Sequence, residues 1–144
     1  MSTDTSGLGD FHQRIEAIII PVSDVDRSRD FYVRLGWRLD VTPPGVVQLT
    51  PPGSATSVQF GPGITDAAPG SSTAYLVVAD IVVAREALVA AGVPVTDYFH
   101  RAPDGFAPGL DPTRATYSTR ATFPDPDHNT WILQEITTRL PGRE

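Results

Sequence analysis

The sequence predicts an α+β domain built from two βαβββ modules in tandem, and three observations carry this prediction. Two segments match without a gap at an offset of 56 residues. Each segment reads as a buried strand followed by a capped helix, and each is followed by further strand patterns between turn signals. Each module is therefore βαβββ, and two such modules must bury the faces of their sheets against other elements.

The matched segments are "IIIPVSDVDRSRDFYVRLGWRL" and "AYLVVADIVVAREALVAAGVPV". The offset pairs Asp24 with Asp80 and Gly36 with Gly92. Few residues are identical, but the positions that start and end structural elements coincide. We therefore interpret the two segments as an internal duplication.

Each copy carries the same local signals. The apolar runs 15–22 and 75–79 predict buried strands, and the aspartate that follows each run can cap a helix by accepting free backbone N–H groups. Apolar and small residues then recur at i, i+3, i+4 and i+7 over 28–35 and 84–91, which predicts a core-facing helix stripe. The paired glycines stand where a helix end needs a left-handed residue.

Further strands follow each helix. They are predicted at 37–41, 46–49 and 56–60 in the first copy, and at 93–96, 116–123 and 130–136 in the second. Residues 100–114 are rich in proline and glycine and predict a long irregular loop, either a lid, a binding loop or interface arm, or a tolerated surface insertion. The predicted organisation is a flexible segment 1–13, one domain 14–137 with modules 14–61 and 73–137, and a tail 138–144.

Composition limits the classes of function. A chain of 144 residues with 40% apolar residues suits one compact domain, and no apolar run approaches the roughly 18 residues that a membrane span needs. The N-terminus lacks a signal-peptide pattern, so we expect a cytoplasmic protein without a membrane partner. The absence of cysteine excludes disulfides, thiolate metal sites and a cysteine nucleophile. A net charge of −6, with scattered arginines and no lysine, argues against a nucleic-acid partner.

The segments "VSDVDRSRDFYVRLGW" and "DPDHNTWILQE", together with the paired modules, resemble the vicinal oxygen chelate superfamily. This superfamily is also called the glyoxalase/bleomycin resistance/extradiol dioxygenase group. The resemblance covers residues 14–137, and the tail "LQEITTRLPGR" is similar to bacterial members. It implies two sheets curled into an open cup that binds ligands on its concave side. It also implies a homodimer, with the cup built either within one chain or across two.

The resemblance further implies where metal-dependent members hold a divalent ion. The corresponding positions are Ala17, Gln59, Thr73 or Ala74, and Ile132. None of them is an imidazole or a carboxylate, the donors that such a site requires. Glu16 and Glu135 lie nearby, but strand alternation aims them at the opposite faces. We therefore expect no metal and no cofactor.

The three histidines differ in their surroundings. His12 and His128 are expected on the surface. His100 closes "VTDYFH", where alternation places it on one face with Tyr98 and Thr96. Beside a pocket, His100 could act as a general base, a hydrogen-bond donor or a pH-sensitive ligand contact. The alternative is a histidine that is tied to the long loop by a hydrogen bond.

The last strand offers two faces, and the side that carries Ile132 and Gln134 is expected to line the cup. Trp131, on the other face, is expected in the core, as is Trp37. Asp125 and Asp127 are interpreted as turn residues rather than as a catalytic pair. The expected ligand contacts are Ala17, Gln59, Tyr75, Tyr98, Ile132 and Gln134.

Three functions remain open from the sequence. The first is a metal-free protein that binds or sequesters an aromatic or hydrophobic metabolite or antibiotic. The second is a lyase, isomerase or oxygenase of this superfamily, either metal-dependent through shifted ligands or metal-free through His100. The third is a dimeric interaction module whose cup is filled by side chains.

Overall fold

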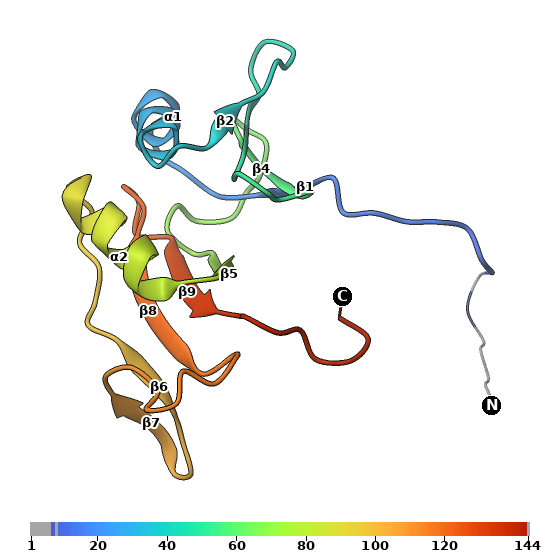
Figure 1. Ribbon diagram of the computed structural model, residues 1–144. Helices are drawn as coiled ribbons and strands as arrows, with labels where there is room; N and C mark the ends of the chain where they lie inside the picture. The colour runs from blue at the N-terminus through green and yellow to red at the C-terminus, as the bar shows by residue number, and fades with distance from the viewer. Residues whose placement is uncertain (1–6, 8, 144) are drawn as a thin grey trace.

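The fold is described from a computed structural model, which places residue 7 and residues 9–143 (Figure 1). Two open sheets of mixed strands each carry one helix, which confirms the predicted α+β class. Sheet A contains β1 (Ala17–Ile19), β4 (Ser57–Phe60), β3 (Val47–Thr50) and β2 (Arg38–Leu39), in that order, with helix α1 (Val25–Arg34). Sheet B contains β5 (Thr73–Val78), β9 (Thr130–Glu135), β8 (Thr119–Pro124), β6 (Phe99–Ala102) and β7 (Gly105–Pro108), with helix α2 (Ile81–Ala90).

The two modules share their topology. In each, the first and last strands pair in parallel and the remaining pairs are antiparallel. Asp24 accepts a hydrogen bond from the Arg27 amide at the start of α1, and Asp80 does the same for the first amides of α2. Gly36 and Gly92 take left-handed φ values of 91° and 86° after the helices. Local structure therefore agrees at the positions that the sequence repeat aligns, while an origin by duplication stays a prediction.

One region differs from the sequence prediction. Residues 93–96 are not a strand, and the stretch expected to be an irregular loop contains the β6–β7 hairpin. Gly105, at φ 124°, follows Pro103 and Asp104, so a tight turn closes the hairpin there. In the segment that precedes the hairpin, the Thr96 hydroxyl accepts the hydrogen bond of the Thr122 amide in place of a backbone carbonyl. Regular strand pairing with β8 is interrupted there. Strand β7 is thus an additional edge that module one lacks.

Residues 9–16 form no helix or strand and are exposed; strand β1 begins directly after them. Residues 1–6 and 8 of the predicted flexible segment lie outside the described residues. Across the part of the chain that the structure describes, every helix is too short or too polar to cross a bilayer.

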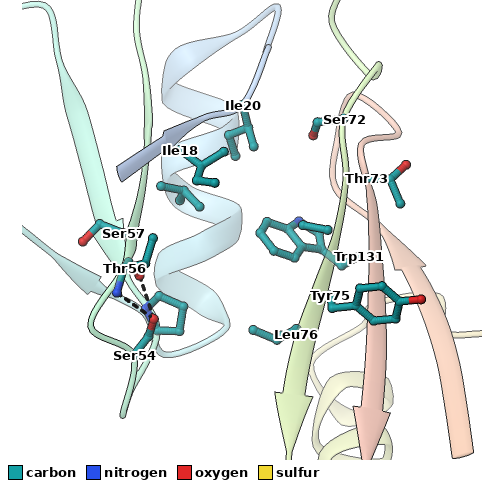
Figure 2. A pocket seen from close by; sticks show the side chains of 13 residues that line it. Ile18, Ile20, Ser54, Thr56, Ser57, Ser72, Thr73, Tyr75, Leu76 and Trp131 are labelled. Carbon is teal, nitrogen blue, oxygen red and sulfur yellow. Dashed lines mark hydrogen bonds between the residues drawn. The ribbon is translucent and has the colours of Figure 1, made fainter. Parts of the chain in front are cut away.

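The helix-facing sides of both sheets share one core. Its centre is aromatic: the Tyr32 and Trp37 ring centroids are 4.8 Å apart, and those of Trp37 and Trp131 are 5.3 Å apart. Both tryptophans are buried, as predicted. Figure 2 shows Ile18 of β1 and Ile20, just after that strand, pointing toward Leu76 and Trp131 of sheet B.

The other sides of the sheets, here called the outward faces, lie on opposite sides of the molecule. In Figure 2 the side chain of Ser57 on sheet A points away from sheet B, and that of Tyr75 on sheet B points away from sheet A. One chain therefore presents two half-cups that do not face each other.

The Asp-Pro-Asp turn joins module two to module one. The Asp125 carboxylate accepts hydrogen bonds from the Tyr32 hydroxyl (2.8 Å), the Asn129 amide side chain (2.8 Å) and the backbone amides of Asp127 and Asn129 (both 2.9 Å). The Trp131 indole donates to Tyr32 in turn (2.9 Å). Burial, followed by the charge of Asp125, raises the pKa of Tyr32 above its ordinary value. We call Tyr32, Asp125, Asn129 and Trp131 the seam cluster. The predicted turn role is confirmed for Asp125, whereas the Asp127 carboxylate accepts the Ser23 amide of module one (3.0 Å).

Candidate functional site: an arginine-lined cavity on sheet B

The outward face of sheet B holds a cavity of about 490 Å³. Strand alternation builds its floor, because Tyr75 and Val77 alternate with core-facing Leu76, and Gln134 alternates with buried Leu133 and Glu135. The lining consists of Tyr75, Val77, Arg101, Tyr117, Arg120, Gln134, Ile136, Arg139, Leu140 and Arg143. Small-molecule sites typically measure roughly 300–1,000 Å³, so the cavity has a suitable size for one ligand.

The C-terminal tail forms one wall of the cavity. Thr116 Oγ1 donates to the Thr138 carbonyl (2.9 Å), and the Leu140 amide donates to the Tyr117 hydroxyl (3.3 Å). The guanidinium of Arg143 lies 5.3 Å from the centroid of the Tyr117 ring. Burial acts to raise the pKa of Tyr117, but the Leu140 hydrogen bond and the neighbouring Arg143 and Arg139 outweigh it and lower that pKa. The tail is thereby held over the sheet.

Arg120 is the central cation of the cavity. It stands on β8, opposite Gln134 of β9, and only 7% of its surface is exposed. Its Nη1 donates to the Ser118 carbonyl (3.1 Å), and its guanidinium carbon lies 5.2 Å from the centroid of the Phe106 ring. Its Nε is buried without a hydrogen-bond partner. A strongly solvated group has therefore been taken from water with few of its donors used.

The structure brings together some of the predicted ligand contacts. Tyr75 and Gln134 line the cavity, and Ile132 is the register neighbour of Tyr75 on the same face. Ala17 and Gln59 stand on the outward face of sheet A, on the opposite side of the molecule. Their role as ligand contacts stays a prediction, and it requires another sheet to approach that face.

Tyr98 and His100 lie away from the cavity lining. The Tyr98 ring packs against the core under the guanidinium of Arg85, at 5.3 Å. His100 is half-buried, and its Nδ1 lies 2.8 Å from the Gly109 carbonyl, which is the loop tether considered as an alternative. A catalytic role for His100 stays a prediction. His12 and His128 are exposed, as predicted.

The positions that hold a metal in metal-dependent relatives do not form a fitting donor set. Thr73 shares the outward face with Ile132, whereas Ala74 faces the core, so the register choice falls on Thr73. The remaining polar candidate, Gln59, donates its amide to Gln48 Oε1 (2.7 Å). Within the described residues, no group of three or more His, Asp or Glu side chains could hold a metal ion.

Polar groups on the outward face of sheet A satisfy one another. Asp40 accepts from Arg38, Gln48 (2.9 Å) and Thr50 (2.6 Å), and the Thr50 hydroxyl also contacts Ser57 (2.6 Å). The hydrogen bond from Arg38, followed by that from Thr50, lowers the pKa of Asp40 from 3.8 to about 2. We call Arg38, Asp40, Gln48, Thr50, Ser57 and Gln59 the sheet A network.

The sequence interpretation missed the arginines of the cavity. Arg120 is the one charged residue of the predicted strand 116–123, and that isolated cation was the available signal. No local signal marked Arg139 and Arg143, because their position depends on how the tail folds over the sheet.

Comparison with known proteins agrees with this geometry. A family model described as the glyoxalase/bleomycin resistance protein/dioxygenase superfamily matches residues 14–133. The chain belongs to this superfamily. The match confirms the resemblance inferred from the sequence motifs. No significant match is found among curated protein sequences.

Solved structures of the superfamily share the fold. The antibiotic-binding protein TnmS3 from Streptomyces sp. CB03234 is 27% identical, with a TM-score of 0.69 over 87% of this chain and 97% of that one. A superfamily member from Sphaerobacter thermophilus is 28% identical, with a TM-score of 0.65 over 86% of this chain and 98% of that one. A bleomycin resistance determinant encoded on the transposon Tn5 is 19% identical, with a TM-score of 0.59 over 88% and 100%, and shares the fold.

Proposed function

We propose that this protein binds or sequesters a small aromatic or hydrophobic molecule, a metabolite or an antibiotic, without converting it. The observation that carries the proposal is the cavity on the outward face of sheet B, in which Tyr75, Val77 and Tyr117 offer apolar surface beside the Gln134 amide. Aromatic and aliphatic walls with a few polar groups are typical of small-molecule sites. The described function of TnmS3 as an antibiotic-binding protein supports the same class of ligand.

A homodimer would complete the cup. The two outward faces of one chain point in opposite directions, so neither can cover the other. In a twofold dimer, the outward face of sheet A from one copy would cover the cavity of the other copy, and the reverse contact would follow by symmetry. Gln59 and Gln134, which lie on opposite faces of one chain, would then meet across the interface. Exposed apolar side chains on both faces, Ile19 on sheet A and Tyr75 and Val77 on sheet B, support such a contact.

The proposed setting is the cytoplasm, with a small molecule rather than a nucleic acid or a membrane as partner. The net charge of −6 opposes the phosphate backbone electrostatically. It does not oppose a ligand that enters a local positive site, because nearby charges dominate over distant screened ones.

A thermal-shift screen of aromatic natural products tests the proposal, followed by calorimetry and by mass spectrometry of the recovered ligand. A ligand present at 100 times its Kd should stabilise the fold by about 2.7 kcal/mol and be recovered unchanged. V77W fills the cavity and should abolish binding, whereas V83W places the same ring on an exposed residue of α2 and should not. Chemical conversion of a ligand, or equal binding to V77W, would contradict the proposal.

A further inference from the structure

Positive charge is concentrated at the cavity of an acidic protein. The chain has 17 Asp and Glu residues against 11 arginines, yet four of those arginines line this one cavity: Arg101, Arg120, Arg139 and Arg143. No carboxylate belongs to the lining within the described residues. Five arginines elsewhere form ion pairs with Asp or Glu: Arg27, Arg29, Arg38, Arg85 and Arg114. The cavity arginines form none in the described part of the chain.

Two carboxylates beside cavity strands, Glu135 next to Gln134 and Asp111 next to Ser118, are already engaged. Glu135 is buried on the opposite face of β9, where it pairs with Arg114 and accepts the Ile81 amide (3.0 Å). Asp111 accepts from the Ser118 hydroxyl (2.7 Å) and from backbone amides of its own turn, and these hydrogen bonds lower its pKa. Neither carboxylate lines the cavity, so neither supplies its counter-charge.

A buried and under-used guanidinium is costly unless something compensates it. Arg120 makes one hydrogen bond, leaves Nε unpaired and is fixed against Phe106. An isolated buried cation is strongly unfavourable, and guanidinium groups match the planar oxygens of carboxylate and phosphate groups. Arg101, on neighbouring β6, adds a second cation that makes no ion pair in the described structure.

We propose that the ligand is anionic: an aromatic body bearing an oxyanion, which Arg120 and Arg101 bind while Tyr75 contacts the ring. This inference rests on the proposed function and narrows its ligand class. Arg139 and Arg143 on the tail add positive potential at the rim, where they increase the association rate more than the affinity. An oxyanion in the cavity supplies the partner that Arg120 lacks in this chain.

A matched pair of fluorescent probes tests the charge requirement on the full-length protein. 1-Anilinonaphthalene-8-sulfonate carries an oxyanion, and N-phenyl-1-naphthylamine has the same aromatic body without it. A charge-assisted hydrogen bond in a buried site corresponds to about 10- to 100-fold in affinity. The wild type should therefore bind the sulfonate at least about tenfold more tightly, and this preference should fall as salt is raised.

Variants separate the two proposals. R120Q should lose the preference for the sulfonate and keep its affinity for the neutral probe, and R101Q should do so to a smaller extent. R34Q removes the same charge from the end of α1, outside the cavity, and should change neither affinity. Inorganic phosphate should displace the sulfonate from the wild type. V77W should lose both probes if the cavity binds small molecules at all.

Two results would overturn the anionic ligand. If the wild type bound both probes with equal affinity and V77W bound neither, the proposed function would stand, but the ligand would not need an oxyanion. Dissociation of a dimer by R120Q, with no preference for the sulfonate, would show that the arginines pair with carboxylates of a second copy. Failure of both probes to bind in the cavity would instead contradict the proposed function itself.

Discussion

Two buried polar clusters in this protein have opposite hydrogen-bonding status. In the seam cluster, the Asp125 carboxylate accepts four hydrogen bonds, and its partners come from both modules. In the cavity, Arg120 is also buried, but it donates one hydrogen bond and leaves Nε unpaired. Burying either charged group costs desolvation free energy, and only for Asp125 do hydrogen bonds within the chain offset that cost.

The difference separates groups that hold the fold from groups that recognise a ligand. A satisfied buried network loses stability when one member is removed, because the remaining members are left unpaired. An unsatisfied buried cation already costs stability, so its replacement by an apolar side chain should be neutral or favourable. Mutations in the two clusters should therefore change stability in opposite directions.

The largest expected effect is loss of the seam. D125A leaves the Tyr32 hydroxyl and the Asn129 side chain with fewer acceptors in a buried site, and we expect it to lower the free energy of unfolding by about 3 kcal/mol. Urea denaturation of D125A measures this. D66A, at an exposed position in the linker between the modules, is the control and should change stability by less than about 0.5 kcal/mol.

If D125A cost less than about 1 kcal/mol, the seam cluster would not behave as a satisfied network, and the comparison would fail on its structural side. A D125A protein that remains folded should still prefer the sulfonate probe, because Asp125 does not line the cavity.

A smaller effect of opposite sign is expected at the cavity. R120M keeps an unbranched side chain against Phe106 and removes the buried charge, so it should leave stability unchanged or raise it by about 1 kcal/mol. The same urea experiment measures it, alongside loss of sulfonate binding. Destabilisation of R120M by more than about 2 kcal/mol would assign Arg120 to the fold rather than to a ligand.

Much of the fold could be predicted from the sequence because its signals are local. Asp24 and Asp80 cap the starts of the helices, and Gly36 and Gly92 follow their ends. The bounds of each helix are therefore set by residues a few positions away in the chain. The prediction for residues 93–108 was wrong because a Pro-Asp-Gly turn closes a hairpin where an irregular loop was expected. In that same region a threonine hydroxyl replaced a ladder carbonyl.

Strand alternation was sufficient to place Ile132 and Gln134 on one face of β9, and in the structure Tyr75 of β5 shares that face. Their role as ligand contacts stays a prediction. Alternation could not place the tail arginines, whose position depends on the contact of Thr116 with Thr138, or the pairing of Tyr32 with Asp125, which are 93 residues apart in the chain. Contacts between distant segments carry no signal in the periodicity of either segment.

The smallest expected effect uses pH to sharpen the comparison. Asp40, in the satisfied sheet A network, has a folded pKa of about 2 against an ordinary value of 3.8. A depressed carboxylate pKa contributes stability that is fully present above pH 3.8 and is lost as the pH falls toward about 2. The melting temperatures of wild type and D40N should therefore differ above pH 3.8 and converge below it.

Arginine stays protonated throughout this range, so the difference between R120M and wild type contains no contribution from titration of Arg120. Curves for R120M and wild type should run parallel where those for D40N and wild type converge. A pH-dependent difference for R120M would instead reveal a titrating carboxylate paired with Arg120, such as one that a second copy of the chain supplies.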